Sequence, residues 1–273
     1  MTTSLQETES SPVITFANVR IGFEDSDVLS GVSFGVMPRE TLVLLGETGT
    51  GKTLTLKLAA GLLRPMQGKI EVLGHEVSSM SEQELLTYRR QLGFVFQEGA
   101  LFDSITVADN VAYGLREEHV SEDEVKSRVH EALRFVELEH TGDMLPSELS
   151  GGMRRRVSIA RALATRPPIV LYDSPTGGLD PVTAQTIITL ILRLRDVFGV
   201  TAILATHRLQ DGFALAKFRF DAETKRVVRL PDFENEPATR FMVYRDGRVY
   251  FDGAPEEFAE SKDAYLQRFL ASI

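Results

Sequence analysis

The sequence contains no cysteine, and this absence excludes several kinds of chemistry at once. Disulfide bonds, thiolate catalysis and cysteine-ligated zinc or iron–sulfur sites all require this residue. Long apolar runs are also missing, because stretches such as TLVLLG and PPIVLY are strand-sized and a helix needs about 20 apolar residues to cross a bilayer. The start, MTTSLQETESSP, lacks the cationic and apolar regions of a secretory signal. We therefore expect the protein to stay outside the hydrocarbon of any membrane on which it acts.

Cations are in the minority, with 30 Lys+Arg against 39 Asp+Glu and a net charge of −9. Because nonspecific affinity for nucleic acid comes from clustered cations, we predict no nucleic-acid partner, although a local basic site is compatible with this charge. The chain has 273 residues, of which 43% are hydrophobic and 25% charged, which is typical of a folded protein with a buried core. This length predicts one large domain with an appended subdomain, or two modest domains.

The order of apolar patterns predicts an α/β chain with an antiparallel part and a helical part. Short β-type runs predict antiparallel strands at 13–36 and 68–72, and fully apolar runs predict buried strands at 41–45, 169–172 and 201–206. Further strands are predicted at 92–97, 241–244 and 249–251, and helices at 52–63, 81–90, 150–164, 182–198 and 255–270. The segment 106–149 is charged with helical spacing and predicts a helical insertion, while residues 1–12 are predicted to be a disordered tail.

A glycine-rich loop lies between the predicted strand 41–45 and the helix that follows it. Its sequence, GETGTGKT, satisfies G-x-x-x-x-G-K-[ST] in the strand-to-helix context that gives this motif its meaning. We expect the backbone of Gly46, Glu47, Thr48, Gly49, Thr50 and Gly51 to surround the phosphates of a nucleoside triphosphate. Lys52 is expected to reach the β- and γ-phosphates and Thr53 to bind Mg²⁺. The alternative is a helix-entry loop that fits the motif by chance.

Asp173 follows the apolar run 169–172, which places a carboxylate at the end of a predicted parallel strand. Ligands of open α/β sheets bind at the carboxyl ends of such strands, so this side chain is expected beside the phosphate loop and near Mg²⁺. An aspartate after an apolar run is common by chance. Its significance depends on the motifs around it.

Five spaced motifs resemble those of the ATP-binding-cassette (ABC) family of ATPases over nearly the whole chain. They are the phosphate loop, Gln97, the sequence LSGGM that ends at Met153, Asp173 with the GLDP that follows it, and His207. The resemblance implies a P-loop NTPase of the α/β class, with a RecA-like core, an antiparallel β subdomain and an inserted α-helical subdomain. It implies an ABC ATPase domain over 13–253 with a helical subdomain at about 98–165. The segment at about 218–240 departs from the family because it is longer than usual, and its sequence predicts an extra hairpin, which we interpret as a surface elaboration in preference to a partner-docking element. Helical spacing predicts a C-terminal helix over 254–273.

The family resemblance also assigns roles to single residues. It implies that Gln97 contacts Mg²⁺ and the attacking water, and that His207 hydrogen-bonds the γ-phosphate. Phe23 is either an adenine-stacking aromatic or a core residue of a β-strand. The residues expected to face a second copy of the chain across a shared ATP are Ser150, Gly151, Gly152 and Asp180. We interpret Arg154, Arg155 and Arg156 as a solvated helix face.

The sequence departs from the family pattern after Asp173. The family has a glutamate that polarises the attacking water, whereas Ser174 stands here. A serine is no carboxylate base, and a positioned general base contributes about 10²- to 10⁴-fold in rate. We hypothesise that the chain binds ATP but hydrolyses it slowly, unless another group substitutes. The nearest acidic residues in the motifs are Glu98 and Glu47, both of which we expect to face solvent.

The family resemblance implies the energising subunit of a membrane transporter, with ATP and Mg²⁺ as cofactors. The stretch 96–117 and the LSGGMRRR form most resemble the ATPases of Mce/Mla-type lipid transporters, which implies phospholipid as cargo. The partners implied are a second copy, a transmembrane permease and an Mce-domain protein, with the chain cytoplasmic and peripheral on the inner face of the membrane. One alternative is an ATP-gated clamp that regulates a membrane assembly without pumping. Another is a soluble cassette acting on DNA or ribosomes, which the net charge disfavours.

Overall fold

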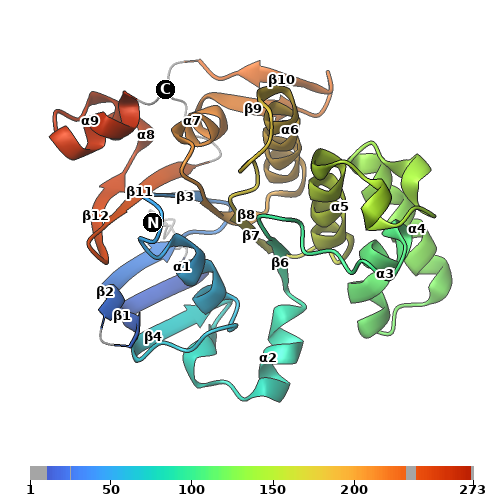
Figure 1. The fold of residues 1–273 in the computed structure, drawn as a ribbon, viewed down its shortest axis with the longest axis horizontal. Helices are drawn as coiled ribbons and strands as arrows, with labels where there is room; N and C mark the ends of the chain where they lie inside the picture. The colour runs from blue at the N-terminus through green and yellow to red at the C-terminus, as the bar shows by residue number, and fades with distance from the viewer. Residues whose placement is uncertain (1–10, 25, 232–237, 272–273) are drawn as a thin grey trace, which may run out of the picture.

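A six-stranded sheet forms the centre of the computed structural model, which describes residues 11–24, 26–231 and 238–271 (Figure 1). Its strand order is β12-β11-β3-β8-β7-β6, and all neighbours are parallel except β12, which pairs antiparallel with β11. The predicted strands of this region are present. Their bounds are β3 (Thr41–Leu45), β6 (Leu92–Val95), β7 (Ile169–Asp173), β8 (Thr201–Ala205), β11 (Thr239–Arg245) and β12 (Arg248–Gly253).

A second, antiparallel sheet has the order β2-β1-β4-β5. The predicted strands at 13–36 form its hairpin, in which Ile14 pairs with Val36 and Phe23 pairs with Ser26. Alternate side chains of this hairpin are buried, which is why the period-two pattern was visible in the sequence. The bounds are β1 (Ile14–Phe23), β2 (Ser26–Val36), β4 (Gln67–Val72) and β5 (His75–Glu76).

The two faces of the central sheet belong to two hydrophobic cores. Alternate residues such as Leu42 and Leu44 pack with α1 and the antiparallel sheet. Their neighbours Val43 and Leu45 pack on the opposite side, among the helices at the right and top of Figure 1. The helices are α1 (Lys52–Ala59), α2 (Glu82–Arg89), α3 (Val107–Glu117), α4 (Glu122–Phe135), α5 (Gly151–Ala164), α6 (Pro181–Phe198), α7 (Leu209–Lys217), α8 (Pro255–Glu260) and α9 (Ala264–Leu270).

The segment predicted as a helical insertion contains α3, α4 and two short 3₁₀ turns, Glu139–Thr141 and Pro146–Glu148. Hydroxyl side chains start both helices, because Thr106 and Ser121 accept hydrogen bonds from backbone N–H groups of the first turn. Both helices pack on α5, which carries the buried stripe of this segment back to the central sheet (Figure 1).

Two predictions of local structure were wrong, and one helix was missed. The helix expected at 52–63 ends at Ala59, since Gly61 has a left-handed backbone. The single helix expected at 255–270 is two helices, because Asp263 turns its carboxylate to accept from the N–H groups of Tyr265 and Leu266 and so starts α9. Helix α7 was not predicted, because the buried polar side chain of Asp211 interrupts its apolar stripe.

The segment after α7 forms a separate hairpin of β9 (Phe218–Asp221) and β10 (Arg226–Arg229). It is anchored to α6 by Arg195 and Asp196, two neighbouring residues of that helix that form a buried ion pair at 2.7 Å, because the Arg195 guanidinium also donates to the Phe218 carbonyl at 2.8 Å. The Asp196 carboxylate also accepts from the N–H of Phe220. Of the extra segment expected at 218–240, residues 232–237 lie outside the described part. None of the helices in the described residues is long and apolar enough to cross a membrane.

Candidate nucleotide-binding site

Four predicted site segments follow four adjacent strands of the central sheet. The phosphate loop follows β3, His207 follows β8, Asp173 ends β7, and Gln97 lies two residues after β6. Because these strands are parallel, their carboxyl ends share one edge of the sheet. The fold therefore gathers at one edge residues that are far apart in sequence, at the place where α/β sheets bind ligands.

The phosphate loop has the backbone that its glycines allow. Gly49 and Gly51 both have positive φ, and Gly51 starts α1 from a left-handed conformation. A Cβ at Gly51 would collide with the side chain of Leu29, so the loop lies against β2 of the antiparallel sheet. This curl together with the start of α1 is the arrangement that directs N–H groups at an anion.

Lys52 and Thr53 join the loop to the strand beside it. The Lys52 ammonium donates to the carbonyl oxygens of Gly46 at 2.7 Å and Glu47 at 2.8 Å. The Thr53 hydroxyl donates to Asp173 Oδ1 at 2.9 Å. A bound phosphate can therefore replace the loop carbonyls as the hydrogen-bond partner of the Lys52 ammonium. Thr53 and Asp173 place a hydroxyl oxygen and a carboxylate oxygen next to each other.

Burial changes the acid–base properties of Asp173 and Lys52. Asp173 is 7% exposed, and burial raises the pKa of its carboxyl, opposed by the Thr53 hydrogen bond and by Lys57, Lys52 and Arg155. Burial lowers the pKa of the Lys52 ammonium, while the charge of Asp173 raises it. A hydroxyl and a carboxylate are hard oxygen ligands, and Mg²⁺ is commonly held by one or two such groups plus the phosphates of its nucleotide. The donor set therefore fits Mg²⁺.

Ser174 has a fixed backbone beside Asp173. Its φ is +45°, its N–H donates to the Ala205 carbonyl at 2.8 Å, and its own carbonyl accepts from the Gly177 N–H at 3.0 Å. A Cβ built on Gly177 would lie 3.4 Å from Ser174 Cβ and 3.7 Å from Gln97 Nε2. Ser174 and Gln97 therefore flank the same glycine. Glu47 and Glu98 are both exposed, as predicted.

A buried carboxylate that sequence reasoning missed supports the segment before His207. Asp211 accepts from the hydroxyl of Thr176 and, at 3.2 Å, from that of Thr206, and its pKa is raised by burial. Thr206 directly precedes His207, which is itself exposed. The network ties the strand end of β8 to the turn after Asp173. The only sign of this network in the sequence was an aspartate four positions after His207. Nothing in the local pattern distinguishes that aspartate from a solvent-exposed one.

The interpretation of the three arginines as a solvated face was wrong. Arg155 is only 6% exposed, and its guanidinium donates to the carbonyl oxygens of Ser174 at 2.9 Å, Pro175 at 3.0 Å and Gly177 at 3.4 Å. Arg154 and Arg156 are half-buried and donate to the carbonyls of Leu149 and Val136. The cations at the start of α5 therefore satisfy backbone acceptors, which compensates for their unfavourable place near a helix N-terminus.

Replacing Arg155 with alanine is expected to lower the free energy of unfolding by about 2–3 kcal/mol, because three backbone acceptors lose a charged donor. Arg154→Ala, which removes one donor to one carbonyl, is the matched control and should cost about 1 kcal/mol or less. Urea denaturation of both variants measures the difference. Equal midpoints for the two variants would contradict the bridging role of Arg155.

The residues expected to face a second copy lie on the other face of the sheet from α1. Ser150 is exposed and starts α5 by accepting from the Met153 N–H at 3.2 Å. Asp180 is exposed and starts α6, accepting from the N–H groups of Val182 and Thr183 at 3.0 Å each. A Cβ at Gly152 would collide with Thr183, so the two helix starts lie in contact. Asp180 thus has a capping role in the isolated chain.

Phe23 ends β1 at the tip of the β1–β2 hairpin, and Leu29 of the same hairpin contacts the phosphate loop at Gly51. Its side chain is 53% exposed, so the alternative of a core strand residue was wrong. An exposed aromatic ring on the hairpin that contacts the phosphate loop is available to stack on a base.

The fold and this edge of the sheet define a P-loop ATPase, and comparisons with known proteins identify its family. A family model described as ABC transporter matches residues 29–177, more than half of the chain. The chain is 31% identical over 259 residues to the intermembrane phospholipid transport ATP-binding protein MlaF of Haemophilus influenzae, covering 94% of this chain and 90% of that protein. The chain therefore belongs to the ABC transporter family and is one of its ATPases.

Two further relatives show how broad this similarity is. The methionine import ATP-binding protein MetN of Bifidobacterium longum is 38% identical over 96% of this chain, which spans only 62% of that protein. The dimeric post-hydrolysis structure of the ATP-binding cassette MJ0796 bound to ADP and Pi has a TM-score of 0.74 and 28% identity, with 88% of this chain and 98% of that chain covered. ATPases of this family bind ATP, dimerise and act with transmembrane permeases.

Proposed function

We propose that this chain is the ATPase subunit of a transporter that moves phospholipid between membranes, from the cytoplasmic face and through a separate permease with an Mce-domain partner. The observation that carries the cargo is the similarity to MlaF, which extends over 90% of a phospholipid transport ATPase. The FQEGALFDSITVADNVAYGLRE stretch and Met153 are the residues that carry the same resemblance within the sequence. The chain is also similar to MetN, which is named as a methionine importer, so a direct measurement has to distinguish the two cargoes.

The geometry supports ATP binding at the carboxyl edge of the central sheet. The phosphate loop holds the phosphates, the Lys52 ammonium moves from the carbonyls of Gly46 and Glu47 to the phosphate oxygens, and Phe23 stacks on the base. Thr53, Asp173 and Gln97 would hold Mg²⁺, which neutralises charge on the transferred phosphoryl group when it is bound. His207, which follows the strand between the loop and Asp173, contacts the γ-phosphate.

The helix start at Ser150 is proposed to complete the site of a second copy. Its first turn offers the N–H groups of Gly151 and Gly152 to an anion, with the positive end of the α5 dipole behind them. Because α5 and α1, the helix that follows the phosphate loop, pack on different faces of one sheet, a head-to-tail pair of chains would clamp each ATP between the phosphate loop of one copy and the start of α5 of the other. Asp180, next to Gly152, would lie at that interface. ATP then holds the dimer closed and hydrolysis opens it.

An exposed aromatic pair marks the proposed contact with the permease. Phe102 is 45% exposed, Tyr113 is 47% exposed, and their rings lie 4.8 Å apart between their centroids. The buried Asn110 side chain holds the Phe102 backbone by accepting from its N–H and donating to its carbonyl. The pair is therefore a rigid apolar anchor of the kind that dominates protein interfaces, and its Phe102 lies five residues after Gln97.

Phe102→Asp is expected to release the chain from its membrane partners, because it places a charge in an apolar contact. Loss of about 10-fold or more in affinity is expected from a single such anchor. The measurement is copurification with the membrane fraction. Leu86→Asp is the matched control, since Leu86 is also apolar and exposed but lies on α2. Equal retention of both variants would contradict this docking site.

The Mg²⁺-dependent part of nucleotide affinity is expected to fall as the pH is lowered through the raised pKa of Asp173. Above that pKa the carboxyl is ionised and can bind a metal, and below it the proton competes with the metal. Calorimetric titration of ADP with and without Mg²⁺, from neutral to about pH 4, measures this. Asp173→Asn is the control, because the nucleotide titrates equally in both proteins. A pH dependence that survives in the variant would assign it to another group.

A second candidate function is an ATP-gated clamp that regulates a membrane assembly without pumping. The observation that favours it is Ser174, which stands where the family has its glutamate base, while Glu47 and Glu98 both face solvent. A turnover that remains slow in the fully assembled complex with cargo present would support the clamp over the pump.

A further inference from the structure

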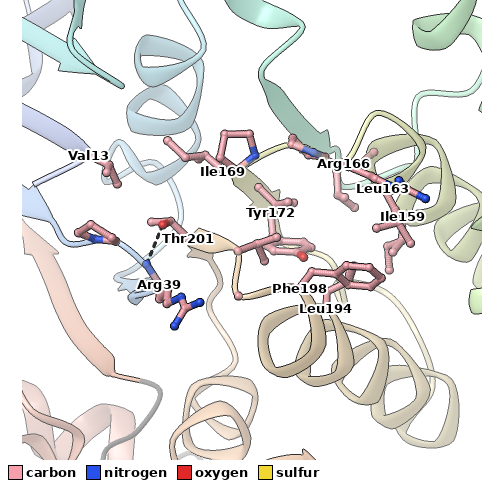
Figure 2. A pocket seen from close by; sticks show the side chains of 18 of the residues that line it. Val13, Arg39, Ile159, Leu163, Arg166, Ile169, Tyr172, Leu194, Phe198 and Thr201 are labelled. Carbon is pink, nitrogen blue, oxygen red and sulfur yellow. Dashed lines mark hydrogen bonds between the residues drawn. The ribbon is translucent and has the colours of Figure 1, made fainter. Parts of the chain in front are cut away.

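A second hollow lies at the amino ends of the strands, on the opposite edge of the sheet from the nucleotide site. It is a cavity of about 370 Å³ between β7, the last turns of α5 and the end of α6 (Figure 2). Apart from Arg39, Arg166 and Thr201, which belong to the segments at the strand starts, nearly all of its lining side chains are apolar. Its volume lies near the lower end of the range of about 300–1,000 Å³ that is typical of ligand pockets.

One polar group among the described residues faces this cavity without a partner. Tyr172 is fully buried on β7, and its hydroxyl makes no hydrogen bond to any described residue. Figure 2 shows its ring projecting from the strand toward Leu194 and Phe198 of α6. Burial raises the pKa of the hydroxyl, so it is a neutral donor at physiological pH.

Water is a poor partner for the Tyr172 hydroxyl. A buried water needs two to four polar partners, and cavities lined by apolar side chains stay dry. A buried hydroxyl without a hydrogen bond is costly. An organic molecule with one oxygen acceptor could hydrogen-bond the Tyr172 hydroxyl, and its remaining apolar surface would suit the apolar walls of the cavity.

The cavity meets a cationic groove. The groove, about 590 Å³ in volume, shares Leu163, Arg166 and Phe198 with the cavity. It runs between α4, α6 and the β9–β10 hairpin, and its lining has five cationic side chains against two acidic ones, Glu131 and Glu137. This excess stands out in a chain with a net charge of −9.

Three of these cations have no carboxylate partner within the described part of the chain, namely Arg134, Arg193 and Lys225. Arg193 is held in place by its contacts with the rings of Phe135 and Phe220, with its guanidinium carbon 4.2 and 5.5 Å from their centroids. It also donates to the Phe135 carbonyl at 3.2 Å. The groove therefore presents an oriented guanidinium, which suits a carboxylate or a phosphate.

We propose that the cavity and the groove together bind a single-chain acyl lipid with an anionic headgroup. The acyl chain occupies the cavity, the carbonyl oxygen next to it accepts from the Tyr172 hydroxyl, and the headgroup lies on Arg193 and Arg134. The volume accommodates one chain. This site is separate from the nucleotide site and from the proposed transport function, so its failure would leave both unaffected.

The test is calorimetric titration of the full chain with three probes below their micellar concentrations. They are a twelve-carbon lysophosphatidate, laurate and neutral monolaurin. We expect saturable one-to-one binding with lysophosphatidate strongest if the headgroup is a phosphate ester, laurate strongest if it is a free fatty acid, and monolaurin weakest in either case. Equal affinity for monolaurin, or the absence of saturable binding by any probe, would overturn the proposal.

Two substitutions separate the two halves of the site. Tyr172→Phe should weaken binding of the preferred lipid by about 3- to 10-fold through loss of one hydrogen bond, and should raise the melting temperature of the lipid-free chain because a buried unpaired hydroxyl is removed. Arg193→Gln should weaken binding of the anionic probes and leave monolaurin unchanged. Arg226→Gln, on β10 outside the groove, is the matched control. Unchanged binding in both site variants, with ADP binding intact as a check on folding, would contradict the assignment.

Discussion

Ser174→Glu is expected to raise the steady-state ATPase rate by about 10²- to 10⁴-fold, the contribution of a positioned general base. The backbone of residue 174 is fixed by hydrogen bonds to Ala205, Arg155 and Gly177, so a glutamate there starts from the same Cβ position as the serine. That position lies beside Asp173 and across Gly177 from Gln97, where the attacking water is expected. The left-handed φ of Ser174 adds no new cost, because the serine already bears it.

The control for this experiment is Ser174→Gln, which has the size of glutamate without its basicity. The glutamine variant should hydrolyse as slowly as the chain with Ser174, and both should form a dimer with Mg-ATP that outlasts the dimer of the glutamate variant. A Ser174 chain that is already fast and gains nothing from glutamate would refute slow hydrolysis. In that case Glu98 is the first residue to replace, because its charge acts on Arg155, whose guanidinium binds the Ser174 carbonyl.

Lys52→Ala is expected to weaken ATP binding by about 10²-fold or more, because charge-assisted hydrogen bonds to phosphate are lost. In the free chain the ammonium donates to two carbonyls of its own loop, so the bound phosphate replaces partners that Lys52 already has. Burial lowers the pKa of Lys52, and the negative charge of Asp173 opposes this shift. The attraction to phosphate depends on the Lys52 ammonium keeping its charge. Calorimetric titration with Mg-ATP measures the loss.

Lys57→Ala provides the comparison for Lys52. Lys57 lies in the last turn of α1, is half-buried and acts on the same carboxylate of Asp173, but it is outside the phosphate loop. Its removal should change ATP affinity by less than about 3-fold, as expected for a charge that acts without a hydrogen bond. If the two lysine variants bind ATP equally well, the loop is a helix-entry turn that fits the motif by chance.

The sequence was more informative about where the site lies than about the buried polar contacts that hold the site together. The phosphate loop and Asp173 were predictable because one follows and the other ends an apolar strand. Gln97 and His207 were selected by the family resemblance, and the parallel strands bring all four to one edge of the sheet. The strands themselves were predictable because β3, β7 and β8 are buried on both faces and read as continuous apolar runs.

The residues that the sequence hid are polar and buried. Arg155 looked like one of three solvated cations, since no local pattern tells which arginine turns inward to carbonyls nineteen or more positions away. Asp211 was missed because no local pattern indicates that it is buried. Helix α7 was missed as well, because this polar residue interrupts its apolar stripe. The cavity beside Tyr172 could not be foreseen, because it depends on how α5 and α6 pack against β7. Tertiary contacts of this kind leave no periodic signal.

The most direct test of the proposed transport function is to purify the chain with its membrane partners from native membranes and identify the bound cargo by mass spectrometry. We predict a phospholipid, present in stoichiometric amount and depleted when Mg-ATP is supplied to a complex that carries Ser174→Glu. Recovery of methionine or another small polar solute in place of phospholipid would contradict the proposal.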